Sequence, residues 1–264
     1  MNDQIDSLVS VTAESTVVAF RGGVESAGEL TPVGSEDRSP VLEFPSNILL
    51  SSPDLRRIHA LADRFDFIVA CDDTVAGFVN LDAIPCVDVM ISSLTKTFSG
   101  SSNVTGGSLV VNPSSRQRDT IKAALSANYE ETYFPLDILT LINNRKNMPC
   151  RVKRFNESTI PLVNLLSSHQ SIATVHHPST APTSSLYQSV MRKDGGYGNV
   201  MSIISVTRPA PNIPTISSIE NVQKYGVPQR ILRISVGLEN SDQLLATVAK
   251  ALKEGELFEL QNTA

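Results

Sequence analysis

Three short apolar runs, each bounded by polar or glycine-rich residues, constrain the fold of this chain most. The runs are Ile68–Cys71, Val87–Ile91 and Gly106–Val111. An apolar run of this length is typical of a strand that is buried in a parallel sheet. The third run opens with two glycines, as expected for a strand that leaves a turn. We therefore expect three strands of one sheet, with the Asp, hydroxyl and Lys side chains that follow the first two converging on one crevice.

The segment before the first run has the pattern of a helix. Ser52-Pro53-Asp54 suits a helix start, because serine can cap, proline fits the first helical position and aspartate is favourable at the positive end of the dipole. The apolar residues that follow at helical spacing are Leu55, Ile58, Leu61, Ala62 and Phe65. A helix over 53–65 followed by a strand over 67–71 predicts an α/β protein with a mainly parallel sheet.

Composition and charge exclude several classes of protein. The chain has 264 residues, of which 41% are hydrophobic and 19% charged, as in a soluble globular protein of one large or two modest domains. Its net charge of -5 argues against nonspecific nucleic-acid binding. It has no signal-peptide pattern at its start and no apolar run near the ~20 residues that span a bilayer. We expect a cytoplasmic protein that binds neither nucleic acid nor membrane.

Cysteine and histidine residues do not predict a metal site. Cys71, Cys86 and Cys150 are odd in number and lack CxxC spacing, so we expect neither a disulfide framework nor structural zinc. Cys71 lies in an apolar run and is predicted to be a buried, unreactive thiol. His176 and His177 are adjacent, and in an extended segment their side chains would point to opposite faces.

Polar residues that follow the first two runs are the candidate functional residues. Asp72 follows the first run, and Ser93, Thr95 and Lys96 follow the second. Open α/β sheets bind ligands at the carboxyl ends of their parallel strands. Lys96 could be an exposed loop residue. It could equally be an amine that forms a Schiff base with a carbonyl cofactor whose phosphate binds the neighbouring hydroxyls. The pattern around Lys96 alone leaves both interpretations open.

Asp72-x-Thr74 followed by Ser93-x-Thr95-Lys96 resembles the pyridoxal-phosphate (PLP) signature of the Cys/Met-metabolism, or transsulfuration, enzymes. The likeness is greatest to their fungal cystathionine gamma-synthase-like branch and covers roughly residues 40–254. The other matching motifs are Glu43–Asn47, Ser92–Gly100, Ser102–Val104, Gly106–Ser108 and Arg233–Glu239. The resemblance implies an α/β fold: a partial fold-type I PLP transferase large domain with a mainly parallel sheet, plus a shortened C-terminal α+β small domain.

The resemblance also implies a role for each residue of the signature. Lys96 would form the Schiff base and later carry protons. Asp72 would keep the pyridine nitrogen protonated, which lets the ring accept carbanion electrons. Ser93 and Thr95 would donate hydrogen bonds to the phosphate.

Two more residues are assigned by the resemblance. Asn47 would lie near the ring oxygen of the cofactor, although Ile48 replaces the usual proline; by itself, Asn47 is typical of a turn. Arg233, in a strand predicted over 231–237, would bind the carboxylate of an amino-acid substrate through two parallel hydrogen bonds. The alternative for Arg233 is an exposed strand arginine.

The implied reaction is gamma-replacement or elimination on an activated homoserine, such as O-acetylhomoserine, in methionine metabolism or fungal secondary metabolism. The family's N-terminal half, with its phosphate-binding turn and stacked tyrosine, has no counterpart before Glu43, and the substrate loop after Thr207 is shortened. The alternative is therefore a truncated, catalytically impaired homologue that acts as a non-catalytic subunit or is a degenerate gene product. We expect a homo-oligomer, or a hetero-oligomer with an intact homologue, because the family's site spans two subunits.

The expected domains are an irregular N-terminal segment at 1–40, a partial PLP-binding large domain at 41–150 and a small domain at 151–264. Within them, strands are possible at 8–11 and 17–20. The other predicted elements are helices at 116–128, 135–144 and 156–168, strands at 41–44, 171–175 and 200–206, and a terminal helix capped near Asn240. A basic cluster near the domain boundary is interpreted as a solvated helix face rather than a nucleic-acid site. Its members are Arg145, Lys146, Arg151, Lys153 and Arg154.

Overall fold

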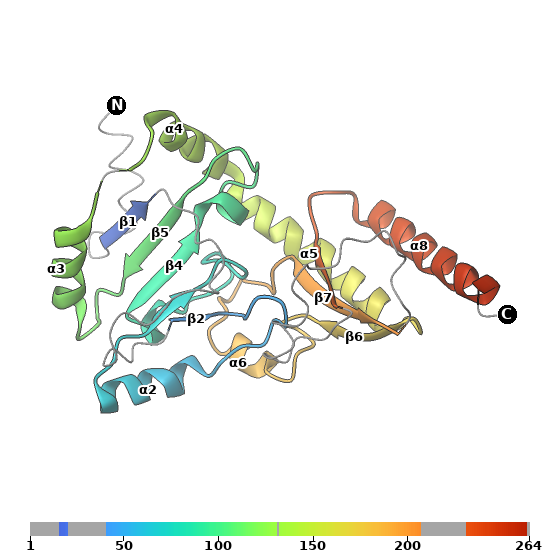
Figure 1. Ribbon diagram of the computed structural model, residues 1–264, viewed down its shortest axis with the longest axis horizontal. Helices are drawn as coiled ribbons and strands as arrows, with labels where there is room; N and C mark the ends of the chain where they lie inside the picture. Colours follow the sequence, from blue (N-terminus) through green and yellow to red (C-terminus); the bar gives the residue numbers. More distant parts are fainter. Residues whose placement is uncertain (1–15, 21–40, 131, 207–230, 263–264) are drawn as a thin grey trace.

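The computed structural model describes residues 16–20, 41–130, 132–206 and 231–262. These residues form a five-stranded sheet and a three-stranded sheet, and the long helix α5 (Met148–Ser167) runs between them (Figure 1). The strand considered at 8–11, most of the segment up to residue 40 and the substrate-loop region after Val206 lie outside the described residues.

The larger sheet has the strand order β1-β5-β4-β3-β2. Its strands are β1 (Thr16–Phe20), β2 (Val41–Glu43), β3 (Ala70–Asp72), β4 (Val89–Ser93) and β5 (Gly107–Val111). β2, β3 and β4 pair in parallel, whereas β5 pairs antiparallel with β4 and with β1. All strands except β5 therefore point the same way, and the expected α/β fold is confirmed.

The smaller sheet is antiparallel in the order β6-β7-β8, formed by β6 (Ile172–His176), β7 (Val200–Ser205) and β8 (Ile231–Ser235). The other helices are α2 (Leu55–Phe65), α3 (Arg118–Asn128), α4 (Pro135–Asn144), α6 (Ser184–Gln188) and α8 (Ser241–Asn262). Three short turns of helix are η1 (Ile84–Cys86), η2 (Leu94–Phe98) and η3 (Arg145–Asn147). Within the described ranges, none of the helices combines the length and apolar character needed to cross a membrane.

The start of α2 differs from the prediction. Asp54 is the capping residue, and its carboxylate accepts a hydrogen bond of 3.0 Å from the backbone N–H of Arg57. Ser52, the predicted cap, instead donates its own backbone N–H to the hydroxyl of Thr183 at 2.9 Å. The prediction of Ser52 was therefore wrong, because an aspartate nearer to the helix serves the same purpose.

The predicted start of α5 was also wrong. The helix begins at Met148, eight residues before the expected 156, with Pro149 in its first turn, where proline has no hydrogen bond to lose. Its buried residues recur at helical spacing: Met148, Val152, Phe155, Ser158, Thr159, Leu162, Val163 and Leu166. The second half of this face packs against the small sheet, and the helix also contacts the turns η2 and η3.

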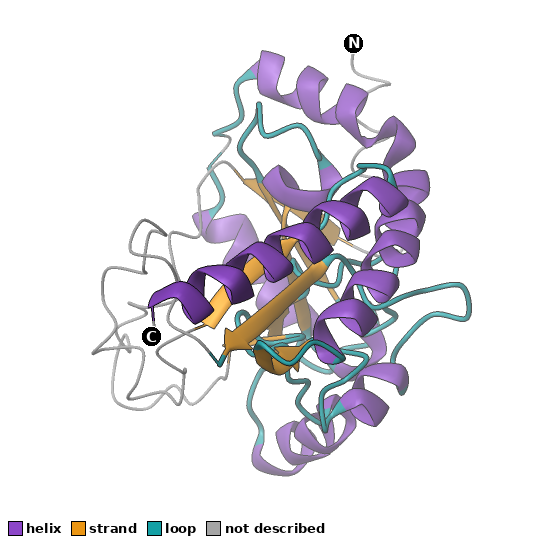
Figure 2. Cartoon of the chain, turned by 90° about the vertical axis from the view of Figure 1, so that its right-hand side faces the viewer, coloured by secondary structure: helices purple, strands orange, loops and turns teal. Residues whose placement is uncertain are grey.

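The smaller sheet has its own apolar core against α5 and α8. Its buried members are Leu162, Val163, Leu166, Met201, Ile203 and Val236. The helix α8, with Leu244, Leu245, Val248 and Leu252 packed on this core, crosses in front of the strands in Figure 2. Asn240 caps α8 as expected, because its side-chain oxygen accepts from the backbone N–H of Gln243 at 3.0 Å.

An aromatic stack connects the end of β2 to the segment after β6. Phe44 stacks on Tyr187 with centroids 5.7 Å apart, and Tyr187 stacks on Tyr197 at 5.3 Å. The ring of His177 lies tilted 6.0 Å from Tyr197 and is fully buried. Burial is the main cause that lowers the pKa of His177 to about 4.

The glycines at 195–198 have a packing reason. A side chain on Gly196 would place its Cβ 2.4 Å from the Asn156 side chain, and one on Gly195 would lie 2.3 Å from the Asn80 carbonyl oxygen. Asn80 accepts from Asn156 at 2.8 Å and from the Gly196 backbone at 2.9 Å. This segment is therefore pressed against the loop of Asn80 and against α5, and only glycine leaves room there.

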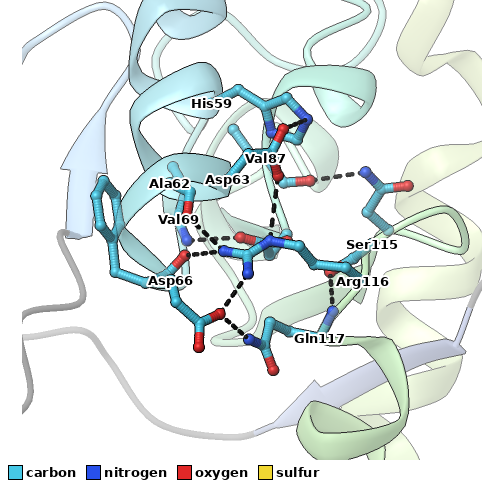
Figure 3. A network of polar contacts seen from close by, with 12 residues as sticks. His59, Ala62, Asp63, Asp66, Val69, Val87, Ser115, Arg116 and Gln117 are labelled. Carbon is cyan, nitrogen blue, oxygen red and sulfur yellow. Dashed lines mark hydrogen bonds and ion pairs between the residues drawn. The ribbon is translucent and has the colours of Figure 1, made fainter.

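A polar network fastens α2 to the start of α3 at the amino-terminal edge of the parallel strands (Figure 3). Arg116 contacts the carboxylates of Asp63 and Asp66 and donates to the carbonyl oxygens of Ala62 and Phe67 at 2.6 and 3.1 Å. Asp66 ends α2 in the left-handed conformation, with φ 54°. This arginine holds the edge of the sheet opposite to the candidate site.

Candidate functional site

Four of the predicted site residues meet at the carboxyl ends of the parallel strands. β3 ends at Asp72 and β4 ends at Ser93, with Thr95 and Lys96 in the turn η2 that follows directly. The parallel register places Glu43 beside Asp72 and Asp72 beside Ile91, so the turn after β2, which holds Asn47, faces the same edge. The expected convergence of these side chains rests on this register.

Asp72 is oriented by the backbone that follows it. One of its carboxylate oxygens accepts from the Thr74 backbone N–H at 2.8 Å. The hydroxyl oxygen of Thr74 in turn accepts from the Ser93 backbone N–H at 2.8 Å. Thr74 thereby joins the ends of β3 and β4 and fixes the Asp72 carboxylate relative to the segment that carries Lys96. The sequence analysis gave Thr74 no role of its own.

Asp73 is the buried acid of the site. Its side chain is 1% exposed and accepts a hydrogen bond from the Ser92 hydroxyl. Burial raises the pKa of Asp73 to about 7, with the Ser92 hydrogen bond acting against it and the neighbouring Asp72 adding to it. Because the group points inward, Asp73 supports the strand end, whereas Asp72 remains partly accessible.

Lys96 lies in a single turn of π-helix. Its backbone departs from helical values, with φ -81° and ψ -120°, and its side chain is exposed. The turn is anchored by the buried Leu94 and closed by bonds from Ser99 N–H to the Leu94 oxygen at 3.0 Å and from Gly100 N–H to the Lys96 oxygen at 2.7 Å. π-turns of this kind are frequent at functional sites.

The Thr95 hydroxyl already has a hydrogen-bond partner, the backbone of Gly106. The hydroxyl oxygen accepts from the Gly106 backbone N–H at 3.0 Å and lies 3.4 Å from the Gly106 carbonyl oxygen. The accepting interaction leaves the Thr95 proton able to turn toward a phosphate, because the contact to the carbonyl is long. Thr95 also ties η2 to the start of β5.

The donor set at this edge fits PLP. Asp72 offers an oriented carboxylate for a ring nitrogen, Lys96 an exposed amine, and Ser93 and Thr95 hydroxyls for a phosphate. Among the described residues, no three His, Cys, Asp or Glu side chains come together as metal ligands would.

Asn47 occupies a tight turn. Its backbone N–H donates to the Glu43 carboxylate at 2.8 Å, and its side chain is exposed. The next residue, Ile48, has φ 116°. Proline, which fixes φ near -65°, could not adopt this conformation. Ile48, which replaces the family's usual proline, thus stands where the backbone excludes proline. The cofactor role of Asn47 stays a prediction.

Arg233 lies at the middle of β8, in the small sheet, and not on the strands that carry the other site residues. It pairs across the sheet with Ser202, which pairs with His176, so these three polar side chains share one face of the small sheet. Ser202 is fully buried, and its hydroxyl has no hydrogen-bond partner among the residues that the structure describes. Arg233 itself is exposed. Its role in binding a carboxylate stays a prediction.

Arg151, which the sequence does not mark as a site residue, touches the turn that carries Lys96. Arg151 was interpreted as part of a solvated basic face, and for this residue the interpretation is wrong. Its guanidinium donates to the carbonyl oxygens of Thr97, Phe98 and Ser99 at 3.3, 2.8 and 3.2 Å. The available signal was spacing: Arg151 stands four residues before the buried Phe155, on the inner side of α5.

Cys71 is buried as expected, and burial raises the pKa of its thiol. Cys86 is also buried and Cys150 is exposed, and all three thiols are free. Neither buried thiol has the electropositive, accessible surroundings of a nucleophile.

The model of the Cys/Met metabolism PLP-dependent enzyme family matches residues 35–210. The chain belongs to this family. A cystathionine gamma-synthase-like protein of Aspergillus thermomutatus, ankD, is 42% identical over 253 residues, which cover 85% of this chain and 45% of that protein. Cystathionine gamma-synthase of Neurospora crassa is 32% identical over 240 residues, covering 81% of this chain and 39% of the relative.

A solved structure supports the same fold for this Cys/Met-metabolism chain. Cystathionine gamma-synthase of Xanthomonas oryzae pv. oryzae aligns with a TM-score of 0.71 at 20% identity, over 83% of this chain and 64% of that one. The expected likeness to fold-type I PLP enzymes is thereby confirmed. The chain spans less than half the length of the two fungal relatives.

Proposed function

We propose that this chain binds PLP at the edge formed by β3, β4 and η2 and takes part in a cystathionine gamma-synthase-like reaction. The observation that carries the proposal is the placement of Asp72, Ser93 and Lys96 at one sheet edge in a member of a PLP-dependent family. The substrate class is an amino acid with an activated gamma carbon, such as O-acetylhomoserine. The reaction is replacement or elimination at that carbon. We also propose that the protein is cytoplasmic.

Bound PLP supplies an electron sink for carbanions formed on an amino acid. The Asp72 carboxylate, held by the Thr74 backbone, would pair with a protonated ring nitrogen. The Lys96 amine would be the covalent attachment point and would carry protons to and from the substrate carbons. Ser93 and Thr95 would hold the phosphate through their hydroxyls, and Asn47 would lie near the ring oxygen.

Arg233 completes the proposed site from the small sheet. Its planar guanidinium is suited to a substrate carboxylate, because two parallel N–H donors match the two oxygens. Its exposure on the face that it shares with Ser202 and His176 supports this assignment, since nothing in the described part of the chain pairs with its charge. The Arg233 guanidinium would hold the substrate with its amine toward Lys96.

The second candidate function is that of a non-catalytic subunit. The chain spans 45% of the length of one relative and 39% of another. In this case the chain would associate with another copy or with a full-length homologue that completes the site. Co-expression with such a homologue and co-purification of a stable mixed oligomer would support it.

The test of PLP binding is the visible absorption of the purified protein titrated with PLP. We expect a saturable band in the wild type that is lost in Lys96→Ala. The matched control is Lys253→Ala, because Lys253 is an exposed lysine on α8. A band that survives Lys96→Ala, or disappears equally in both variants, would contradict the role of Lys96.

Turnover is tested separately. O-Acetylhomoserine is supplied with a thiol, and release of acetate is measured for the wild type and for Arg233→Leu. We expect a raised KM in the variant, because the carboxylate loses its partner. A protein that shows the lysine-dependent band but no acetate release, alone and with a full-length homologue, would leave PLP binding and remove the gamma-replacement proposal.

A further inference from the structure

The side chain of Arg151 fastens the turn that carries Lys96. One terminal nitrogen of its guanidinium faces three consecutive carbonyl oxygens, those of Thr97, Phe98 and Ser99, at 2.8 to 3.3 Å. The other terminal nitrogen donates to the Asn144 carbonyl oxygen at 2.9 Å. The guanidinium therefore spans the carboxyl end of η2 and the end of α4.

These contacts are suited to a positive charge. The carbonyl oxygens at the carboxyl end of a helical turn have no partner within the turn and carry the negative end of its dipole. No carboxylate pairs with Arg151 in the part of the chain that the structure describes, so carbonyl oxygens alone offset its charge. Burial accordingly lowers the pKa of Arg151. An arginine in this setting binds backbone rather than forming a surface ion pair.

The backbone at Gly100 is shaped to the guanidinium. Gly100 has φ 69°, which favours glycine, and a Cβ there would lie 2.8 Å from the Arg151 Nε. Asn144 strengthens the same junction, because its amide donates to the Ser99 hydroxyl at 2.7 Å and to Asn103 at 2.9 Å. The end of the Lys96 turn thus fits closely around one charged group.

We propose that Arg151 is a positioning residue that sets the backbone of Lys96 and so aims its amine at the bound cofactor. The proposal rests on the proposed function, because it concerns the same lysine. Arg151 stands in the first turn of α5, and the far part of that helix packs under the small sheet. The helix α5 therefore contacts both the turn that carries Lys96 and the small sheet that carries Arg233.

The first variant to test is Arg151→Lys, which keeps the positive charge but lacks the planar fork whose two terminal nitrogens reach the carbonyl oxygens of η2 and of Asn144 together. We expect its PLP dissociation constant, from the visible titration, to rise roughly tenfold to a hundredfold, as for loss of charged hydrogen bonds. Hydrogen exchange at the Ser99 and Gly100 amides, whose bonds close the turn, should accelerate. In the protein without PLP, the rate of Lys96 acetylation at a fixed pH should change relative to that of Lys253, the internal reference.

The matched control is Arg116→Met. Arg116 also holds backbone carbonyl oxygens, but at the opposite edge of the same sheet (Figure 3). We expect this variant to lower the unfolding temperature while Lys96 acetylation, Ser99 and Gly100 exchange and PLP affinity stay at wild-type values. Equal changes in both variants would mean a general loss of stability and would overturn the proposal.

Two further outcomes decide the matter. Faster exchange in Arg151→Lys with unchanged Lys96 acetylation and PLP affinity would overturn the positioning role. If Arg151→Lys does not fold, Gly100→Ala replaces it as the test, because the added Cβ displaces the guanidinium without removing it. This variant should give the same three changes. Wild-type behaviour of Gly100→Ala would overturn the proposal. If the wild type shows no lysine-dependent band, the proposal of PLP binding is refuted. The role of Arg151 is still tested in that case, because hydrogen exchange and Lys96 acetylation are measured without PLP.

Discussion

His177 should make the stability of this protein depend on pH in a way that one substitution reveals. The ring is fully buried beside Tyr197, and its Nδ1 accepts from the Ser179 backbone and contacts the Ser179 hydroxyl at 2.7 Å. Its other nitrogen, Nε2, is buried and makes no hydrogen bond of ordinary geometry within the described residues, although the backbone of Gly198 acts to raise the pKa against burial. Protonation would therefore place a charge in an apolar setting and remove an acceptor.

The size of the effect follows from the pKa values. Burial lowers the pKa of His177 from 6.5 to about 4. Because the folded pKa is depressed, the neutral ring is favoured in the folded state, so the contribution is complete above pH 6.5 and lost as the pH falls toward 4. Between pH 7 and pH 5 the folded state should lose about 2 kcal/mol through this group.

Asp73 opposes this trend in the same pH range. Its pKa is raised from 3.8 to about 7, so its contribution is present at low pH and lost as the pH rises through 7. Between pH 7 and pH 5 the folded state should gain about 2 kcal/mol through Asp73. The stability of the wild type should consequently change little over this range, and the two contributions must be separated by substitution.

The assay compares the wild type with His177→Gln by urea unfolding at pH 7 and pH 5. Glutamine keeps an acceptor but cannot be protonated, so the variant should gain about 2 kcal/mol relative to the wild type when the pH is lowered. A ring-proton titration by NMR gives the His177 pKa directly. A difference between the two proteins that is the same at both pH values, or a midpoint near 6.5, would refute the burial argument.

Other expected outcomes concern the buried acid, a crowded glycine and the small core. Asp73→Asn should gain about 2 to 3 kcal/mol relative to the wild type between pH 5 and pH 8 in urea unfolding, because the amide carries no charge to bury. Gly196→Ala should lower the unfolding temperature through its clash with Asn156, costing about 1 to 3 kcal/mol, whereas Gly255→Ala, with open space around it, should be neutral or stabilising. Leu162→Ala, at a site 1% exposed, should cost about 2 to 5 kcal/mol, and a cost below 1 kcal/mol would contradict the packing of α5 on the small sheet.

The sheet edge was readable from the sequence because its signals are local. An apolar run that ends in Asp72, and another that ends in Ser93, predict two buried strands, and parallel pairing brings their ends together whatever the rest of the chain does. The reversed direction of β5 was not readable, because a run of apolar residues does not encode the direction of its partner.

The contacts of Arg151 with the turn that carries Lys96 could not be predicted for a different reason, because its spacing before Phe155 indicates only that it faces inward. Arg151 binds backbone carbonyl oxygens, and these carry no side-chain pattern that could mark them in advance. Its neighbours Lys153 and Arg154 are exposed, so the basic cluster as a whole did suggest a solvated face. The early start of α5 was hidden by Pro149, which marks a helix start as readily as a break. The divisions at residues 40 and 150 remain predictions.

The separation of Lys96 and its clamp along the chain sets an order of assembly during synthesis. Asp72, Ser93 and Lys96 belong to one short stretch, whereas Arg151 lies 53 residues beyond Phe98, the residue that it bonds most closely. At the roughly 5 to 20 residues per second of translation, the clamp leaves the ribosome about 3 to 10 s after the turn that it holds. The nascent chain therefore presents the turn that carries Lys96 before Arg151 is available to bind it, and under the proposed function competence for cofactor attachment would arrive with α5 rather than with the sheet.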